Sequence, residues 1–271
     1  MKSKNEKALG KISRLEGIIR RLGSVVVAFS GGVDSTFLLR VASDTLGRNN
    51  VLAVIARSET YPRREYDEAL AFVKDSGIPH KVISTDELKI KNYSNNPVDR
   101  CYYCKKELFG KIDAIRNSRG FGAVLDGTNY DDRLDVRHGT RAAAELGVVS
   151  PLSRAKFTKD NIRYFSRKLG LKTHNKASFA CLASRFPHSH RITRGKLNRV
   201  DRAEEFIKSL GYAQVRVRDY GDMARIELYK SDIKKFAAKG HAPKVSAYLK
   251  RLGYAFVTLD LEGYRTGSMN A

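Results

Sequence analysis

The sequence has few acidic residues, few cysteines and no long apolar run. Among 271 residues, 51 Lys and Arg face 29 Asp and Glu, which gives a formal net charge of +22. No apolar stretch is long enough to cross a bilayer, and the N-terminus lacks the apolar region of a secretory signal. We therefore expect a cytoplasmic protein with no membrane partner. Three cysteines, an odd number, argue against a disulfide framework.

The excess of positive charge favours polyanionic or anionic ligands, such as nucleic acid, nucleotides or charged substrates. The basic residues are spread along the chain and form no single tail, so a generally basic surface explains the charge equally well. Charge alone does not choose between these interpretations.

The most informative stretch is residues 25–39. Residues 25–29 are apolar and predict a buried strand, and an apolar-periodic helix follows as far as about Ala42. The glycine turn between them brings backbone N–H groups and a helix N-terminus together, which suits a phosphate. No Lys follows the glycines at the spacing of a Walker A loop. The residues that we predict to bind the nucleotide here are Ser30, Gly31, Gly32, Asp34, Ser35 and Thr36.

The order Ser-Gly-Gly-Val-Asp-Ser-Thr resembles the PP-loop of ATP pyrophosphatases, which cleave ATP between its α- and β-phosphates. The resemblance implies that this loop holds the pyrophosphate and that Asp34 helps to place Mg²⁺.

Strands and helices alternate through the first two thirds of the chain. Further strands are predicted at 51–56, 80–84 and 123–125, and helices at 2–22, 63–76, 105–118 and 158–169. This order predicts an α/β fold, a parallel sheet with helices on both faces, and ligands at the carboxyl ends of the strands. Two loops at that edge become nucleotide candidates: Arg57 and Ser58 toward the adenosine, and Asp126, Gly127, Thr128 and Asn129 toward the phosphates. Asp131, just beyond, is a candidate Mg²⁺ ligand.

A second, smaller α+β domain is predicted after residue 187, so the expected domains are 1–187 and 188–271. Its elements are expected to be a helix at 193–210, strands at 213–219 and 223–229, a helix at 232–252 and a strand at 254–260. Arg216 and Arg218 alternate with valines and share one face of a strand. On the residues alone, a solvated strand face explains this pattern.

Cys101 and Cys104 form a C-x-x-C pair in what reads as a Tyr-rich loop, and Cys181 is the remaining thiol. Three thiols are one fewer than a closed zinc site needs. A redox dithiol is possible in principle, although the pair does not follow the first strand. Three thiolates could hold a [4Fe–4S] cluster with one iron open to a ligand such as sulfide. The residues alone leave these options, and simple burial, open.

Dispersed motifs along essentially the whole chain resemble the LarE family of ATP-dependent sulfur transferases. The segments that carry the resemblance are residues 30–36, 100–105, 126–129, 181–185, 216–218 and 260–270. NAD and GMP synthetases share only the first of these. The family adenylates a carboxylate of pyridinium-3,5-biscarboxylic acid mononucleotide, releases pyrophosphate and replaces an oxygen with sulfur, in biosynthesis of the nickel-pincer nucleotide. One branch sacrifices a single cysteine, and another carries a [4Fe–4S] cluster on three cysteines.

The resemblance implies ATP with Mg²⁺, a [4Fe–4S] cluster on Cys101, Cys104 and Cys181, and a small mononucleotide substrate. Cys181 matches the sacrificial position, which leaves the sulfur donor open, and the source of sulfide is not indicated. The residues implied to contact substrate are Ser184, Arg185, Glu204, Arg216 and Arg218. Relatives form homo-oligomers, so the resemblance implies one here.

Two rival interpretations remain. A PP-loop tRNA thiolase also joins adenylation to sulfur transfer and would suit the net charge, because phosphate contacts dominate nucleic-acid affinity. No appended RNA-binding domain is visible, so we do not expect a nucleic-acid partner, although the charge alone would allow one. A non-enzymatic basic nucleic-acid-binding protein would need neither cluster nor pyrophosphate release, and the intact first loop argues against it.

Overall fold

The computed structural model describes residues 2–134, 138–177, 179–265 and 268–269. The chain forms two compact units. The first comprises Met1–Ser58, Arg63–Thr85 and Asp99–Phe179, and the second comprises Glu59–Pro62, Asp86–Val98 and Ala180–Ala271. The predicted ranges, 1–187 and 188–271, differ from these units in three places. Residues 180–187, Glu59–Pro62 and Asp86–Val98 belong to the second unit and not to the first.

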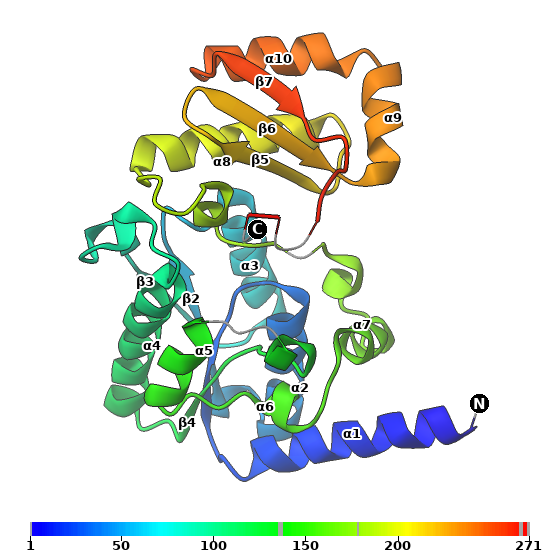
Figure 1. The fold of residues 1–271 in the computed structure, drawn as a ribbon. Coiled ribbons are helices and arrows are strands. Elements are labelled where there is room, and N and C mark those ends of the chain that lie inside the picture. Colours follow the sequence, from blue (N-terminus) through cyan, green and yellow to red (C-terminus); the bar gives the residue numbers. More distant parts are fainter. Residues whose placement is uncertain (1, 135–137, 178, 266–267, 270–271) are drawn as a thin grey trace. The chain divides into compact units, whose positions relative to one another are not determined.

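A parallel sheet of four strands, ordered β3-β2-β1-β4, forms the centre of the first unit (Figure 1). The strands are β1 (Val25–Ala28), β2 (Val51–Arg57), β3 (His80–Ser84) and β4 (Ala123–Leu125). Val25 and Val27 belong to one apolar cluster, whereas Val26 belongs to another on the opposite face. Both faces are therefore buried, which explains why the strand reads as a continuous apolar run. The α/β prediction is confirmed.

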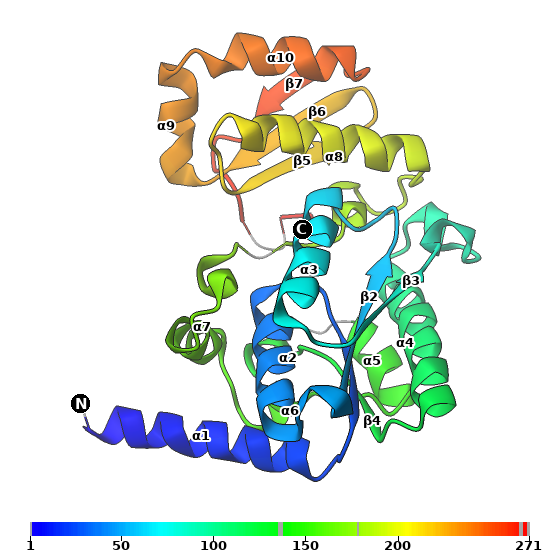
Figure 2. The same cartoon turned by 180° about the vertical axis from the view of Figure 1, so that it is seen from behind.

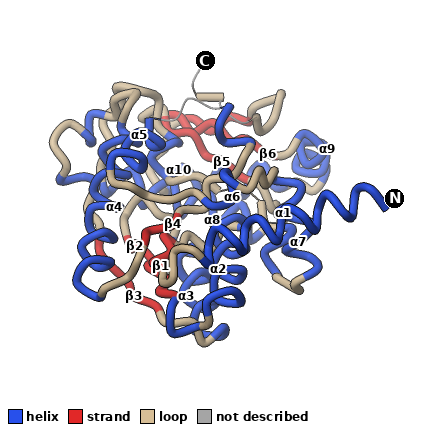
Figure 3. The backbone as a smooth tube through the Cα atoms, turned by 90° about the horizontal axis from the view of Figure 1, so that it is seen from below, coloured by secondary structure: helices blue, strands red, loops and turns tan. Residues whose placement is uncertain are grey.

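Helices cover both faces of this sheet (Figures 1 and 3). They are α1 (Lys2–Arg20), α2 (Val33–Leu46), α3 (Arg63–Ser76), α4 (Arg100–Arg119), α5 (His138–Glu145), α6 (Pro151–Arg154) and α7 (Lys159–Lys168). Buried residues of α4 and α5 join the cluster on one face, and those of the other helices join the cluster on the other. The strand order reverses between β1 and β4, and open α/β sheets bind ligands at the carboxyl ends of the strands beside such a reversal.

The second unit contains a three-stranded mixed sheet, ordered β5-β6-β7 (Figure 2). Its elements are α8 (Arg194–Ser209), β5 (Val215–Asp219), β6 (Met223–Leu228), α9 (Lys230–Ala238), α10 (His241–Arg251) and β7 (Phe256–Leu259). β5 and β6 are antiparallel, and β6 and β7 are parallel across the α9–α10 crossover. Val215, Val217 and Ile226 belong to the apolar core that these helices share.

The single helix predicted at 232–252 is wrong. Two helices occupy the segment, separated at Lys239 and Gly240, and Gly240 adopts φ +63°. A left-handed residue cannot continue a right-handed helix, and glycine takes that conformation at little cost. In the described part of the chain, no helix combines the length and apolarity needed to cross a membrane.

Candidate functional site

The loop between β1 and α2 is tightly built. Gly31 has φ +62°, and a Cβ placed on it would lie 2.7 Å from the Cβ of Ala69 in α3, so only glycine fits. The Ser35 hydroxyl lies 3.0 Å from the Ser30 hydroxyl and donates to the Gly32 carbonyl at 3.2 Å. The Thr36 N–H donates to the Gly32 carbonyl at 2.9 Å and closes the first turn of α2. The six predicted nucleotide residues therefore lie together at the N-terminus of α2.

Two polar atoms in this turn are buried without hydrogen-bond partners among the described residues: Asp34 Oδ1 and Thr36 Oγ1. A buried carboxylate oxygen and a buried hydroxyl left unsatisfied in a protein interior are costly. Their position beside a helix N-terminus fits a phosphate-bound cation and a phosphate oxygen. This donor set fits the expected ATP with Mg²⁺.

Lys159, the first residue of α7, is a site residue that the sequence analysis missed. Its Nζ lies 2.5 Å from Asp34 Oδ2, and its backbone N–H donates to Asp131 Oδ2 at 2.7 Å. Thr158 caps α7 by accepting from the Asn161 N–H, and this cap fixes where Lys159 begins the helix. Burial raises the pKa of Asp34, and the positive charge of Lys159 opposes that rise.

The loop after β4 lies directly against the N-terminus of α2. A Cβ on Gly127 would be 3.1 Å from the Ser35 backbone nitrogen. The Asp126 carboxylate makes its hydrogen bonds within the loop itself. It accepts from the Thr128 N–H at 3.2 Å and from the Thr128 hydroxyl at 2.7 Å. Asn129 Oδ1 likewise accepts from the Asp131 N–H at 2.9 Å. These side chains shape the loop, and Gly127 brings its backbone close to the PP-loop.

Asp132 is a second carboxylate that the prediction omitted. Its charge is among those that raise the pKa of Asp34, after burial, so it lies within electrostatic range of that carboxylate. Its Oδ2 accepts from the Asn129 N–H at 3.1 Å. Arg57 ends β2, with its guanidinium 5.9 Å from the centre of the Tyr66 ring, and Ser58 follows it. Arg57 and Ser58 thus lie at the carboxyl edge of the sheet, where the nucleotide was predicted.

The C-x-x-C pair lies on a helix and not in the expected loop. α4 begins at Arg100, so Cys101 and Cys104 occupy its first two turns, three residues apart and on one side of the helix. Cys101 is exposed and Cys104 is partly buried. A Cβ on Gly139 of α5 would lie 3.9 Å from the Cβ of Cys101, which shows how closely α5 packs there.

Cys181 belongs to the second unit, in a loop held by Arg185. Arg185 Nη1 donates to the carbonyls of Ala180 (2.9 Å) and Cys181 (3.2 Å) and to Ser184 Oγ (2.9 Å). The other side of the guanidinium makes a bidentate pair with Glu204, at 2.7 and 2.9 Å. Arg185 is only 1% exposed, so its donors are used within the protein and it fixes the backbone around Cys181.

Burial alone would raise the pKa of Glu204, but the charge and hydrogen bonds of Arg185 outweigh it and lower that pKa. Glu204 Oε1 also accepts from the Val217 N–H at 3.0 Å, which ties α8 to the edge of β5. Ser184, Arg185 and Glu204 therefore form one connected network.

Arg216 and Arg218 point to the face of the β5–β6 sheet opposite the apolar core. Arg218 donates to Glu227 Oε2 (2.6 Å) and to the Ser184 carbonyl (2.9 Å), and its buried Nε has no hydrogen-bond partner within the described structure. Burial, followed by the nearby charge of Arg185, lowers the pKa of Arg216 to about 10. Both causes disfavour the charged form of Arg216, which is buried beside a second arginine.

Arg225 and Glu227 complete what we call the arginine cluster: Arg185, Arg216, Arg218 and Arg225 with Glu204 and Glu227. Strand register places Arg225 opposite Arg218 and Glu227 opposite Arg216, so the four share one face. Arg225 donates to Glu227 Oε1 at 3.0 Å. The prediction missed these two residues, although the alternation along β6 could have revealed them.

Within the described residues, no group of three or more His, Cys, Asp or Glu side chains is arranged to hold a metal ion. The three cysteines are divided between the units, two in the first and one in the second. The chemistry of the set, three thiols, fits a cluster with one open iron.

Comparison with known proteins shows the family of the chain. A family model described as NAD synthase matches residues 16–103, which include the PP-loop. The chain is 39% identical over 260 residues to the pyridinium-3,5-bisthiocarboxylic acid mononucleotide synthase of Lactiplantibacillus plantarum, covering 96% of this chain and 94% of that protein. The chain belongs to the LarE family.

Two uncharacterized relatives also match along most of the chain. An uncharacterized protein of Synechocystis is 40% identical, with 96% of this chain and 97% of that protein covered. An uncharacterized protein of Methanocaldococcus jannaschii is 29% identical, with 89% and 91% covered. The likeness to the family thus spans both the PP-loop and the arginine cluster. Of the LarE-like C-terminal segment 260–270, Thr266, Gly267 and Asn270 lie outside the described residues.

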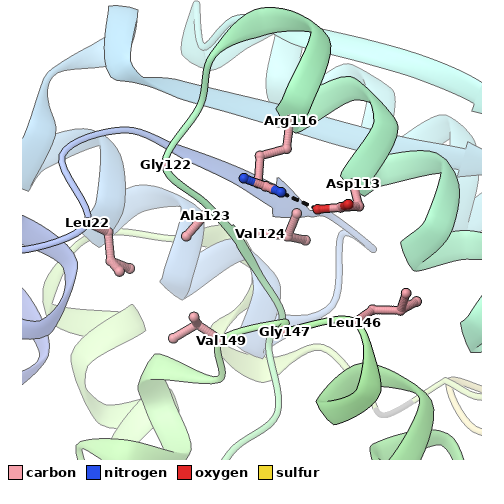
Figure 4. Close-up of a pocket in the computed structure, with 9 residues that line it drawn as sticks. All are labelled: Leu22, Asp113, Arg116, Gly122, Ala123, Val124, Leu146, Gly147 and Val149. Atoms are coloured by element: carbon pink, nitrogen blue, oxygen red, sulfur yellow. Dashed lines mark hydrogen bonds and ion pairs between the residues drawn. The ribbon is translucent and has the colours of Figure 1, made fainter.

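A pocket of about 360 Å³ lies at the amino ends of β1 and β4, at the edge of the sheet opposite the PP-loop (Figure 4). Its two charged lining residues pair with each other, with Arg116 Nε 2.6 Å from Asp113 Oδ1. The rest of the lining is backbone and apolar side chains such as Leu22 and Leu146. With its charges neutralised internally, this pocket offers little to an anionic nucleotide.

Proposed function

We propose that this protein is an ATP-dependent sulfurtransferase that acts on pyridinium-3,5-biscarboxylic acid mononucleotide. It adenylates a substrate carboxylate, releases pyrophosphate and replaces an oxygen with sulfur, as a step toward the nickel-pincer nucleotide. The observation that carries the proposal is the likeness to the L. plantarum synthase, because it covers 96% of this chain and both candidate sites. ATP and the mononucleotide are the proposed small-molecule partners.

In the proposed first step, a substrate carboxylate oxygen attacks the α-phosphorus of ATP, and the bond to the β-phosphate oxygen breaks. The products are an acyl-adenylate and pyrophosphate. The backbone of residues 30–36 and the N-terminus of α2 stabilise negative charge on the departing group. Lys159 would donate to that group, and Asp34 with Asp131 would hold Mg²⁺, which screens the phosphate charges when bound.

The arginine cluster is the proposed site for the substrate phosphomonoester. Four arginines face Glu204, Glu227 and Asp260, whose carboxylate lies 3.6 Å from Arg225 Nε, so one positive charge is left over. A phosphomonoester carries about −1.5 to −2 near neutral pH, so its charge is opposite in sign to this excess. Arg216 and Arg218 would contact the phosphate. Arg185 and Glu204 would act indirectly, by holding the Cys181 loop and β5, with Ser184 between them.

In the proposed second step, a sulfur nucleophile attacks the activated carbonyl and AMP leaves, so a thiocarboxylate forms. Cys101, Cys104 and Cys181 are the proposed thiolate ligands of a [4Fe–4S] cluster, which would supply a bound sulfide. Two observations support the set: the chain has three cysteines, and Cys101 and Cys104 share one side of α4. If no cluster forms, Cys181 is the proposed sacrificial donor.

Pyrophosphate release tests the first step. We expect the wild-type protein to release pyrophosphate from ATP only with the dicarboxylate mononucleotide present. Lys159→Met should lower kcat by about 100-fold, because a charged group at the departing phosphate is lost. Lys168→Met, at the exposed C-terminal end of the same helix, is the matched control and should stay within about twofold. Release that requires tRNA instead, or an unaffected Lys159→Met variant, would contradict the proposal.

Iron and acid-labile sulfide analysis tests the second step. After anaerobic reconstitution we expect about four irons per chain in the wild type and a loss of iron in Cys101→Ala. Absence of iron from the wild-type protein would instead favour sacrifice of Cys181. In that case the mass of the protein should fall by one H₂S after a single turnover.

A further inference from the structure

The segment after β7 is anchored against the end of β6. The Asp260 N–H donates to the Ile226 carbonyl at 2.8 Å, and the Tyr264 N–H donates to the Leu228 carbonyl at 2.7 Å. Between them the chain turns at Gly263, which has φ +75°. A Cβ on Gly263 would lie 2.7 Å from the Leu228 carbonyl oxygen, so no side chain fits there. This close approach fixes the point at which Tyr264 leaves the turn.

Tyr264 reaches the arginine cluster from this anchor. Its ring centre lies 5.3 Å from the Arg216 guanidinium carbon. Its phenol also interacts electrostatically with both Arg216 and Arg185. Tyr264 therefore brings a hydroxyl group to the part of the cluster that contains Arg185 and Arg216.

Ser268 reaches the same cluster further along the segment. Its hydroxyl accepts from Arg218 Nη2 at 3.0 Å and donates to Glu227 Oε1 at 3.0 Å. Glu227 is fully buried, and Arg218 is 5% exposed. Tyr264 and Ser268 contribute neutral hydroxyl groups to these charges, whereas Asp260, at the start of the segment, lies 3.6 Å from Arg225 Nε and offsets that arginine. The two hydroxyl groups thus order Arg216 and Arg218 without neutralising them, which leaves positive charge for a ligand.

We propose that the C-terminal segment forms part of the substrate site, with Tyr264 donating its hydroxyl to the phosphomonoester held by Arg216 and Ser268 positioning Arg218. The inference rests on the proposed function, because it takes the arginine cluster to be the phosphomonoester site. It assigns Tyr264 to recognition of the phosphate group and not of the heterocycle. Tyr264 therefore distinguishes a mononucleotide from the corresponding nucleoside.

Binding of the mononucleotide and of its dephosphorylated nucleoside, measured by calorimetry, tests this assignment. Tyr264→Phe should weaken binding of the mononucleotide by about 10- to 100-fold, the range for one hydrogen bond to a charged group, and leave nucleoside binding unchanged. Tyr229→Phe removes the same hydroxyl from the neighbouring ring, whose centre lies 6.4 Å from that of Tyr264, and should bind both ligands like the wild type. Inorganic phosphate should displace the mononucleotide from the wild-type protein. Phosphate itself should bind more weakly to the Tyr264→Phe variant.

A second variant tests the segment in case the Tyr264 substitution alone does not change binding. Ser268→Asp places a carboxylate against Arg218 and beside Glu227, so mononucleotide binding should fall by at least 100-fold while ATP binding by the first unit persists. Normal mononucleotide binding by both Tyr264→Phe and Ser268→Asp, with loss of binding in Arg216→Gln, would overturn the role of the segment and leave the proposed function standing. Failure of the wild-type protein to bind the mononucleotide would overturn both.

Discussion

At the scale of single residues, one missing side chain decides how closely two loops approach. Gly127 lets the loop after β4 contact the N-terminus of α2, since a Cβ there would be 3.1 Å from the Ser35 nitrogen. Both surfaces are backbone and cannot rotate away. We expect Gly127→Ala to destabilise the protein by about 1–3 kcal/mol, as overpacking does elsewhere, and to weaken ATP binding. Urea denaturation and nucleotide titration would measure the two effects.

Gly110, within α4, is the matched control for that substitution. A Cβ added there meets no atom within 4 Å. Since Ala is the better helix former, Gly110→Ala should stabilise the protein by about 0.5–1 kcal/mol and leave ATP binding unchanged. Equal effects of the two substitutions would show that the space between the loops does not matter.

Residues whose role is local could be predicted, and residues whose partners are distant could not. The six nucleotide-loop residues are brought together at the N-terminus of α2 because a strand, a glycine turn and a helix start specify that geometry within seven positions. Lys159 was missed because its partner, Asp34, lies 125 positions away, and nothing local marks such a pairing. Asp126 was predicted to contact phosphate, whereas in the structure its carboxylate forms hydrogen bonds to Thr128 of the same turn.

At the scale of elements, strand alternation was a better guide than helix length. The pattern around Arg216 and Arg218 correctly predicted a shared face, because a strand has only two faces. The apolar periodicity of 232–252 continued across Gly240, so it did not show that two helices divide there. Similarly, Cys101 and Cys104 precede a clear helical pattern by one turn, and helix starts are difficult to place without a strong cap. Asp99 precedes α4 without a side-chain cap bond.

At the scale of the whole molecule, the basic residues occur in two different environments. Many surface cations of the first unit pair with acids one helical turn away, such as Arg40 with Asp44 and Lys111 with Glu107. In the second unit, the four arginines of the cluster converge on two buried glutamates. The first arrangement contributes little to stability, whereas the second makes the folded state depend on buried charges. The two units should therefore respond differently to acid.

The lowered pKa of Glu204 sets the direction of that response. A carboxylate whose folded pKa is depressed contributes stability above its ordinary value, near 4.5, and loses it as the pH falls through the folded pKa. At neutral pH, Glu204→Gln leaves Arg185 buried and unpaired, at a cost of about 3–5 kcal/mol. The gap between variant and wild type should then narrow as the pH falls below 4.5, because the wild type loses the same interaction.

Hydrogen exchange read by mass spectrometry can follow each unit separately. Peptides from residues 215–228 should lose protection in Glu204→Gln at pH 7, whereas peptides from residues 25–57 should keep theirs. Glu205→Gln is the neighbouring control: its ion pair with Lys208 spans one helical turn and is partly exposed, so it should cost less than about 1 kcal/mol. If both variants showed the same pH profile, the buried pair with Arg185 would not be what stabilises the second unit. A selective, pH-dependent loss in Glu204→Gln would instead show that this pair holds β5, and with it Arg216 and Arg218, in place.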